Sequence, residues 1–174
     1  SLRTGIMAGA TCPIEVMKRV IEQMHMAEVQ IAYGMTETSP VTHFVAAQRQ
    51  NWTKYGSVGA VVAGMDAKLI DTETGREVAD GERGELCVRG PNVMAGYFNN
   101  DEATRRTIDE DGWLHTGDVA VVDAEGDFTI VDRVKELIKY KGYQVPPAEL
   151  EALLLGHDAI ADAAVIPVPD EEAG

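Results

Sequence analysis

The sequence predicts a mixed α/β (α+β) fold, because helical and strand-like patterns succeed one another along its 174 residues. Apolar side chains recur at helical spacing over residues 13–25, and they alternate with polar ones from Val29 to Tyr33. From about residue 55, short strand patterns are separated by glycine-containing turns. We therefore expect a helix–strand unit, a small distorted β-barrel and an incomplete C-terminal α+β unit.

The first helix is expected over residues 13–25, with Thr11 as its cap and Pro13 in its first turn. The strand that follows ends near Tyr33, so the loop that begins at Gly34 leaves the carboxyl end of a strand. Ligands collect at that end in α/β sheets. The loop is therefore a candidate binding segment.

The expected barrel occupies the middle of the chain. Its strands are predicted over residues 65–71, 85–89, 119–123 and 128–132, with glycine turns between them. A short helix is expected over residues 101–107, behind an Asn99-Asn100 cap.

The C-terminal segment has a different texture. Residues 135–144 alternate and turn at Gly142, as a β-hairpin does. A helix is expected from Pro147 to Leu155, ended by Gly156, and residues 161–168 have the pattern of a buried strand. We expect a domain boundary between residues 1–132 and 133–174, with the second domain truncated.

Composition excludes some functions. The net charge of −14 argues against nucleic acid, whose affinity depends on Lys and Arg. No apolar run is long enough to span a bilayer. Cys12 and Cys87 lie far apart and have no disulfide or zinc spacing, which favours a reducing, cytoplasmic setting.

Residues 132–144 form a positive island in this acidic chain. They hold four cations and two acids, a local charge of +2, so the rest of the chain carries −16. The island indicates either an anionic small ligand or a solvated hairpin face.

Gly34-Met35-Thr36-Glu37 has groups suited to nucleotide phosphates. Gly34 permits close approach of the backbone, and the Thr36 hydroxyl can donate to a phosphate oxygen. The Glu37 carboxylate is a hard ligand for Mg²⁺. Taken alone, such a segment after a strand is usually just a polar loop.

A second candidate is Asp118, which follows the Thr116-Gly117 turn. A carboxylate there can accept hydrogen bonds from both hydroxyls of a ribose, although many turn aspartates have no such role. A strand pair turning at Glu125-Gly126 would bring Asp118 beside Arg133. We expect Trp113 in the core and a structural role for His115.

The motifs at residues 33–38, 84–90, 113–118 and 132–144, taken in order, resemble the adenylate-forming enzymes. This superfamily includes acyl-CoA synthetases, 4-coumarate–CoA ligases, luciferases and peptide-synthetase adenylation domains. The resemblance runs over nearly the whole chain. Such enzymes also carry a phosphate loop and a distal catalytic lysine, which this chain lacks, so we expect an internal piece of a longer fatty or aryl acid–CoA ligase.

The resemblance implies a role for each motif. It implies that Thr36 contacts the α-phosphate of ATP, that Glu37 holds magnesium, and that Asp118 and Arg133 bind the ribose. It assigns the remaining positions as follows: Gly9, Ala10, Thr11, Tyr33, Gly34 and Met35 to the nucleotide; Pro40 and Val41 to the acid pocket; Lys135 to a hinge; Lys139 and Gln144 to thioester formation; Lys141 and Gly142 to CoA.

The implied reaction activates a carboxylic acid with Mg·ATP and then forms an acyl-CoA thioester. One alternative is an adenylation domain that loads a carrier protein, although the form of residues 139–144 favours the CoA ligases. Another is that the chain by itself is a nucleotide-binding or structural module. The acid is left open, with medium-chain fatty acids and aryl acids both considered.

Overall fold

The structure, a computed structural model, describes residues 2–10, 12, 14–45, 57–141, 143–157 and 159–169, and for residue 144 the backbone only. Three expected site positions, Thr11, Gly142 and the side chain of Gln144, lie outside the described residues. So does Pro13, the expected first residue of the first helix.

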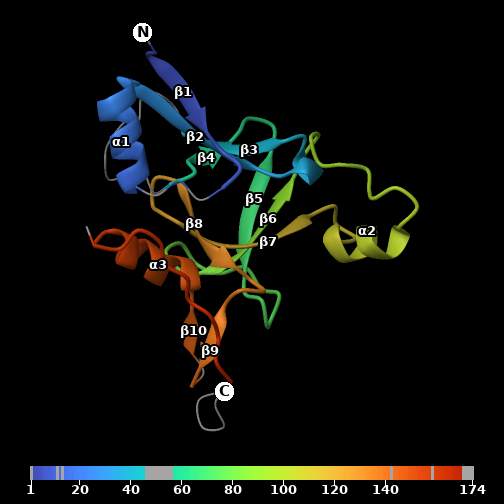
Figure 1. Cartoon of the computed structure of the whole chain (residues 1–174). Coiled ribbons are helices and arrows are strands. Elements are labelled where there is room, and N and C mark those ends of the chain that lie inside the picture. The colour runs from blue at the N-terminus through green and yellow to red at the C-terminus, as the bar shows by residue number, and fades with distance from the viewer. Residues whose placement is uncertain are drawn as a thin grey trace.

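The first part of the chain is a β-α-β unit extended by two more strands (Figure 1). β1 (Thr4–Met7) and β2 (Glu28–Gly34) are parallel neighbours, joined through α1 (Ile14–Met24). β3 (Val41–Phe44) pairs antiparallel with β2, and β4 (Ala60–Val61) pairs with β3. The buried face of α1 centres on Met17, which packs against Val29 and Ile31 of β2. The predicted helix and strand are confirmed.

The second part is a four-stranded antiparallel sheet in sequential order. It consists of β5 (Asp66–Ile70), β6 (Gly84–Arg89), β7 (Leu114–Val122) and β8 (Phe128–Arg133). Leu86, Val88, Leu114 and Ala120 are fully buried in its core. α2 (Asp101–Thr107) lies outside this sheet (Figure 1) and is capped by Asn100, whose Oδ1 accepts from the Ala103 N–H at 3.0 Å.

The expected barrel is wrong: in the part of the chain that the structure describes, the sheet does not close. β5 and β8 are its two edges. The edge of β8 that faces away from β7 is hydrogen-bonded to the segment just before β4. The Phe128 N–H donates to the Gly59 carbonyl at 2.9 Å, and the Phe128 carbonyl accepts from the Val58 N–H at 2.8 Å. These bonds occupy the edge with which β5 would have to pair. The two sheets are thereby joined.

The C-terminal segment forms the predicted hairpin and helix. β9 (Ile138–Tyr140) pairs with β10 (Tyr143–Val145), and α3 (Pro147–Leu155) follows. The hairpin is shorter than predicted, because Lys135 lies in a turn where the Glu136 N–H donates to the Arg133 carbonyl at 3.0 Å. The segment contacts the second sheet through α3 and β8.

Two further expectations are wrong. Residues 161–168 form no strand, and Ile166 and Val168 are 73% and 74% exposed. An apolar alternation needs a neighbouring edge to satisfy its backbone groups, and no described strand pairs with this one. Trp113 is only half-buried, and its ring is contacted by two surface cations: Lys68 Nζ and the Arg89 guanidinium lie 4.3 and 4.4 Å from the ring centroid. No helix in the described ranges is long and apolar enough to cross a membrane.

Candidate functional site

Two loops that were predicted to bind a ligand leave the same edge of the first sheet. β1 and β2 are parallel, with Met7 opposite Ile31. Gly9-Ala10 therefore follows the carboxyl end of β1, just as Met35 follows that of β2. Gly9 has a φ of +85°, a conformation that glycine adopts without strain. This edge is where an α/β sheet presents its loops to a ligand.

The loop after β2 is folded tightly on itself. A Cβ on Gly34 would overlap the Pro40 carbonyl oxygen, so the close approach requires glycine. Thr38 is fully buried, and its Oγ1 accepts from the Met35 N–H at 3.1 Å and lies 3.0 Å from the Pro40 oxygen. Thr36 is exposed on the short 3₁₀-helix over residues Thr36–Thr38.

Three predicted site residues meet around one carboxylate. Asp118 and Arg133 are register partners on β7 and β8, side by side as predicted, and a one-residue register shift between Val119 and Ala120 brings them opposite each other. The Tyr33 hydroxyl donates to Asp118 Oδ2 at 2.6 Å, and Arg133 Nε lies 3.4 Å from Asp118 Oδ1. The Asp118 side chain is 13% exposed and that of Arg133 is 69% exposed. The carboxylate is thus set inside, with the guanidinium towards solvent.

The electrostatics of this group follow from burial. Burial raises the pKa of Asp118, while the Tyr33 hydrogen bond and the Arg133 charge act in the opposite direction. Burial and the neighbouring Asp118 carboxylate raise the pKa of Tyr33 far above its ordinary value, so the phenol keeps its proton. The arrangement comprises a buried acceptor (Asp118), a donor that keeps its proton (Tyr33) and an exposed cation (Arg133).

Glu37 is held from another segment. The Tyr97 hydroxyl donates to Glu37 Oε1 at 2.7 Å, and the Met94 N–H donates to the Glu37 carbonyl at 2.8 Å. Asn92 Nδ2 donates to the Val41 carbonyl at 2.8 Å, so the chain after β6 lies along the loop after β2. The hydrogen bond to Glu37 raises the pKa of Tyr97. Sequence reasoning missed Tyr97, because 60 residues separate the pair and no local pattern joins them.

The hairpin residues lie elsewhere. Lys139 stands opposite Gln144 in the β9–β10 register, and its Nζ is 3.9 Å from Glu73 Oε1. Lys141 is exposed in the connecting turn, with Nζ 5.6 Å from the centroid of the Tyr140 ring. Figure 1 shows this hairpin at the opposite end of the molecule from β2 and β3. Among the described contacts, Lys139 pairs with Glu73 and Lys141 lies against Tyr140, and neither reaches Asp118.

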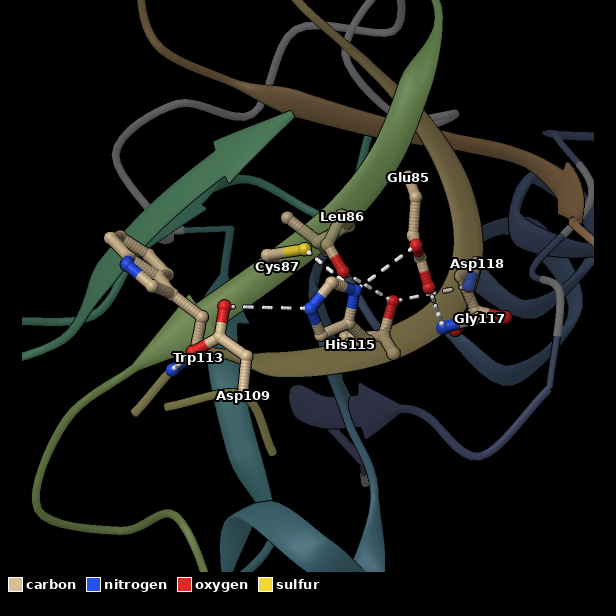
Figure 2. Close-up of polar contacts among 9 residues, drawn as sticks. Glu85, Leu86, Cys87, Asp109, Trp113, His115, Gly117 and Asp118 are labelled. Carbon is tan, nitrogen blue, oxygen red and sulfur yellow. Dashed lines mark hydrogen bonds and ion pairs between the residues drawn. The ribbon is translucent and has the colours of Figure 1, made fainter. Parts of the chain in front are cut away.

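A third cluster was not predicted (Figure 2). His115 Nδ1 lies 3.2 Å from Glu85 Oε2 and 3.6 Å from Cys87 Sγ, and His115 Nε2 lies 3.6 Å from Asp109 Oδ2. The donor atoms of Glu85, Cys87 and His115 are all within 4.8 Å of one another, a mixed set of the kind that zinc accepts. Residues 28 and 30 positions apart supply it, so spacing could not reveal it.

In this structure the groups of the cluster interact with one another, and a metal ion would have to displace a thiol proton and existing hydrogen bonds. Burial, reinforced by the Glu85 carboxylate, raises the pKa of the Cys87 thiol to about 12. A thiol must lose its proton to bind a metal. Glu85 is also engaged already, because its Oε1 accepts from the Gly117 N–H at 3.1 Å.

Comparison with known proteins supplies the family. The sequence model of AMP-binding enzymes matches residues 1–98. The chain is 49% identical to 4-coumarate–CoA ligase-like 1 of Arabidopsis thaliana, over 99% of this chain and 32% of that protein. It is also 49% identical to luciferin 4-monooxygenase of Photinus pyralis, over 95% of this chain and 30% of that protein.

A solved structure agrees. The o-succinylbenzoate-CoA synthetase of Bacillus subtilis, in complex with its acyl-adenylate intermediate, superposes with a TM-score of 0.86 at 33% identity, over 99% of this chain and 34% of that one. The chain thus spans about a third of the length of these relatives. It belongs to the AMP-binding family of adenylate-forming enzymes.

Proposed function

We propose that this chain is the nucleotide-holding segment of an AMP-forming acid–thiol ligase. In the whole enzyme a carboxylate would attack the α-phosphate of ATP and release pyrophosphate, and the acyl group of the resulting adenylate would then pass to the thiol of CoA with release of AMP. One observation carries the proposal: the Asp118 carboxylate is held between the Tyr33 hydroxyl and the Arg133 guanidinium, beside the carboxyl end of β2.

In this proposal Asp118 accepts hydrogen bonds from the ribose hydroxyls. A hydrogen bond to a charged acceptor is stronger than one between neutral groups. The Tyr33 hydroxyl fixes the carboxylate, and its ring forms one side of the adenine site. Arg133, being largely exposed, donates to the ribose from the outside. The loops at Gly9-Ala10 and Gly34-Met35 supply backbone groups to the nucleotide.

Thr36 and Glu37 would face the phosphates. A partly exposed carboxylate is a suitable ligand for Mg²⁺, and the Tyr97 hydroxyl orients it, as outer partners of metal ligands commonly do. When bound, the metal ion would neutralise phosphate charge. The Thr36 hydroxyl would donate a hydrogen bond to an α-phosphate oxygen. Reaction at phosphorus is promoted mainly by positioning and charge stabilisation, which these groups supply.

The hairpin would serve the second half-reaction. The Lys139 side chain pairs with Glu73 and not with Asp118 in this structure, so in this proposal the hairpin moves to bring Lys139, Lys141, Gly142 and Gln144 to an adenylate. Lys135, in the turn between β8 and β9, is the proposed hinge. We accordingly propose that residues 1–132 and 133–174 belong to different domains.

The acid is proposed to be aromatic. The plant relative is named for 4-coumarate, an aryl acid, which favours that class over medium-chain fatty acids. Pro40 and Val41, adjoining the loop after β2, would border the acid. The solved o-succinylbenzoate-CoA synthetase, which holds an acyl-adenylate, supports the adenylate step, whereas the luciferin relative is named as an oxygenase and adds no support for the thiol step. Loading of a carrier protein is the alternative second step.

We place the enzyme in the cytoplasm, where Cys12 and Cys87 would remain free.

The test uses the full-length protein that carries this chain. We expect ATP–pyrophosphate exchange that depends on 4-coumarate, and thioester formation when CoA is added. Asp118→Ala should reduce exchange at limiting ATP, whereas Asp66→Asn, an exposed carboxylate paired with Arg89, should not. Absence of exchange with both 4-coumarate and octanoate would overturn the proposal. Exchange without a CoA thioester would favour the carrier-protein alternative.

A further inference from the structure

The segment that carries Asp118 is a bulge in β7. The register of β6 and β7 runs from Gly84↔Ala120 and Glu85↔Val119 to Cys87↔His115. Leu86 alone therefore stands opposite Thr116, Gly117 and Asp118. Bulges redirect side chains beside functional sites. Here the bulge presents Asp118 to Tyr33 of the other sheet.

The bulge residues do not make the regular backbone hydrogen bonds between β6 and β7. Other hydrogen bonds satisfy their backbone groups. The Gly117 N–H donates to Glu85 Oε1 at 3.1 Å, and the Gly117 carbonyl accepts from the Val134 N–H at 2.8 Å. Thr116 Oγ1 donates to the Leu86 carbonyl at 2.8 Å and accepts from the Asp118 N–H at 3.1 Å. Gly117 has a φ of +73°, which a regular strand would not contain.

The Glu85 side chain is itself held in place. Its second oxygen lies 3.2 Å from His115 Nδ1, and Asp109 Oδ2 lies 3.6 Å from His115 Nε2 (Figure 2). Asp109 is anchored by the Trp113 N–H, which donates to its Oδ1 at 2.8 Å. Glu85 is only 15% exposed, and both of its carboxylate oxygens have partners, His115 and the Gly117 N–H.

We infer that Glu85, oriented by His115, is a positioning residue for the ribose site: it stabilises the Thr116–Asp118 bulge and thereby aims the Asp118 carboxylate at the nucleotide. The inference rests on the proposed function. Without an acceptor for the Gly117 N–H, pairing of β7 with β6 would compete with the bulge. A one-residue change of strand register turns a side chain to the other face of the sheet.

Electrostatic assistance does not explain Glu85. A second carboxylate near Asp118 makes ionisation of Asp118 harder, and the Glu85 charge does act to raise the Asp118 pKa. The benefit of Glu85 is therefore geometric. That role predicts that an uncharged side chain with an oxygen in the same place will preserve it.

The experiment measures nucleotide binding to the full-length protein by calorimetry, with AMP and 2′,3′-dideoxy-AMP as probes. The second probe lacks both ribose hydroxyls, so the ratio of the two affinities reports on the Asp118 contact. The variants are Glu85→Ala, Glu85→Gln, Asp118→Ala and the double variant Glu85→Ala/Asp118→Ala. Cys87→Ala is the matched control, since Cys87 is buried on the same strand and contacts His115, but has no bond to the bulge.

We expect Glu85→Ala to weaken AMP binding about ten- to a hundredfold, the loss typical of a hydrogen bond to a charged group. Binding of the dideoxy compound should hardly change. Glu85→Gln should restore most of the ratio, and the double variant should bind AMP no more weakly than Asp118→Ala. Cys87→Ala should lower the melting temperature and leave the ratio unchanged.

Several results would overturn the inference. One is a Glu85→Ala protein that loses thermal stability but keeps the wild-type ratio, and another is a Glu85→Gln protein that behaves like Glu85→Ala. Tight zinc binding by the wild type, abolished together with the ratio in Cys87→Ala, would instead identify a metal centre. A wild type that does not prefer AMP over the dideoxy compound refutes the proposed ribose site. In that case, deuterium exchange over residues 114–120 still decides the role of Glu85: faster exchange in Glu85→Ala supports it, and unchanged exchange refutes it.

Discussion

Tyr33, Asp118 and Arg133, here called the Asp118 corner, and the β9–β10 hairpin were both predicted to serve one reaction. The two regions are nevertheless built differently. Asp118 lies in a sheet whose neighbouring side chains Leu114 and Ala120 are fully buried, and its contacts cross from one sheet to the other. The hairpin has two strands, and Tyr140 and Tyr143 are 50% and 73% exposed. Its Lys139 makes one long ion pair, between two largely exposed side chains.

This difference separates two requirements. A group that must hold a ligand in one geometry benefits from a well-packed scaffold with satisfied backbone bonds. A group needed in only one half-reaction can belong to a segment with few buried contacts, because such segments open at low free-energy cost. The proposed division of labour between Asp118 and Lys139 follows this contrast. The predictions below test it, beginning with the largest effect.

The largest difference is expected in the loss of unfolding free energy when a side chain is truncated in the second sheet and in α3. Leu114→Ala removes a fully buried side chain and should lower the free energy of unfolding by about 2–5 kcal/mol. Leu153→Ala in α3 changes a side chain that is 76% exposed, and should cost less than about 0.5 kcal/mol. Urea unfolding of both variants checks this. Equal losses would mean that the C-terminal segment is packed as firmly as the sheet.

Acid should lower the free energy of unfolding through His43, whose ring contacts that of Tyr33. His43 is fully buried, with its ring against Tyr33 and Phe128, and burial lowers its pKa to about 4. Between about pH 6.5 and 4 the unfolded chain binds the extra proton, so stability should fall as the pH falls, by at most about 3 kcal/mol. Asp118 has a raised pKa and acts in the opposite direction, since its stabilising effect is lost as the pH rises.

The difference between the wild type and His43→Gln isolates the contribution of His43, because Asp118 is common to both proteins. Unfolding free energies from pH 4 to pH 7 should converge at the acid end. Parallel curves would show that His43 does not carry this pH dependence.

The ribose contact should come next. Asp118→Ala should weaken ATP and AMP binding about ten- to a hundredfold, as expected for loss of a hydrogen bond worth about 1.5–3 kcal/mol. Arg133→Ala should cost less, because the guanidinium is 69% exposed and screened by water. Equilibrium binding of both nucleotides measures this. A larger loss for Arg133→Ala would reverse the assignment of the inner and outer partner.

A smaller change is expected at Glu37. Tyr97→Phe removes one hydrogen bond to a partly exposed carboxylate, worth about 0.5–1.5 kcal/mol, and should raise the magnesium requirement of adenylation about two- to tenfold. Glu37→Ala should raise the magnesium requirement more than Tyr97→Phe does. Titration of ATP–pyrophosphate exchange with Mg²⁺ separates the two. An unchanged magnesium dependence in Glu37→Ala would remove Glu37 from the proposed metal site.

The smallest effect on adenylation is expected from the hairpin. Lys139→Ala should leave the rate of acyl-adenylate formation within about twofold, since the pair with Glu73 is exposed and contributes little, and it should slow thioester formation. Separate assays of the two half-reactions decide this. Equal loss in both steps would contradict the division between the corner and the hairpin.

Local patterns predicted the helices best. The expected bounds of α2 and α3 match the structure, because the Asn100 cap, Pro147 and Gly156 act within a few residues of themselves. The pairing of β7 with β8 was also predictable from the tight turn at Glu125-Gly126, but the register shifts by one residue between Val119 and Ala120, and this irregularity is what places Asp118 opposite Arg133. The predicted strand at residues 161–168 is absent. An apolar pattern indicates which side chains would face a core, but it does not supply a neighbouring strand for the backbone to pair with.

The sequence by itself determined the order of helices and strands, the motifs that resemble the adenylate-forming enzymes, and the pairing of β7 with β8. Each depends on neighbouring residues or on one short turn. Only the tertiary structure decided that the second sheet stays open, that Tyr97 holds Glu37, and that Glu85 supports the Asp118 bulge. These contacts join residues from 32 to 60 positions apart, and so they depend on how the sheets meet in space.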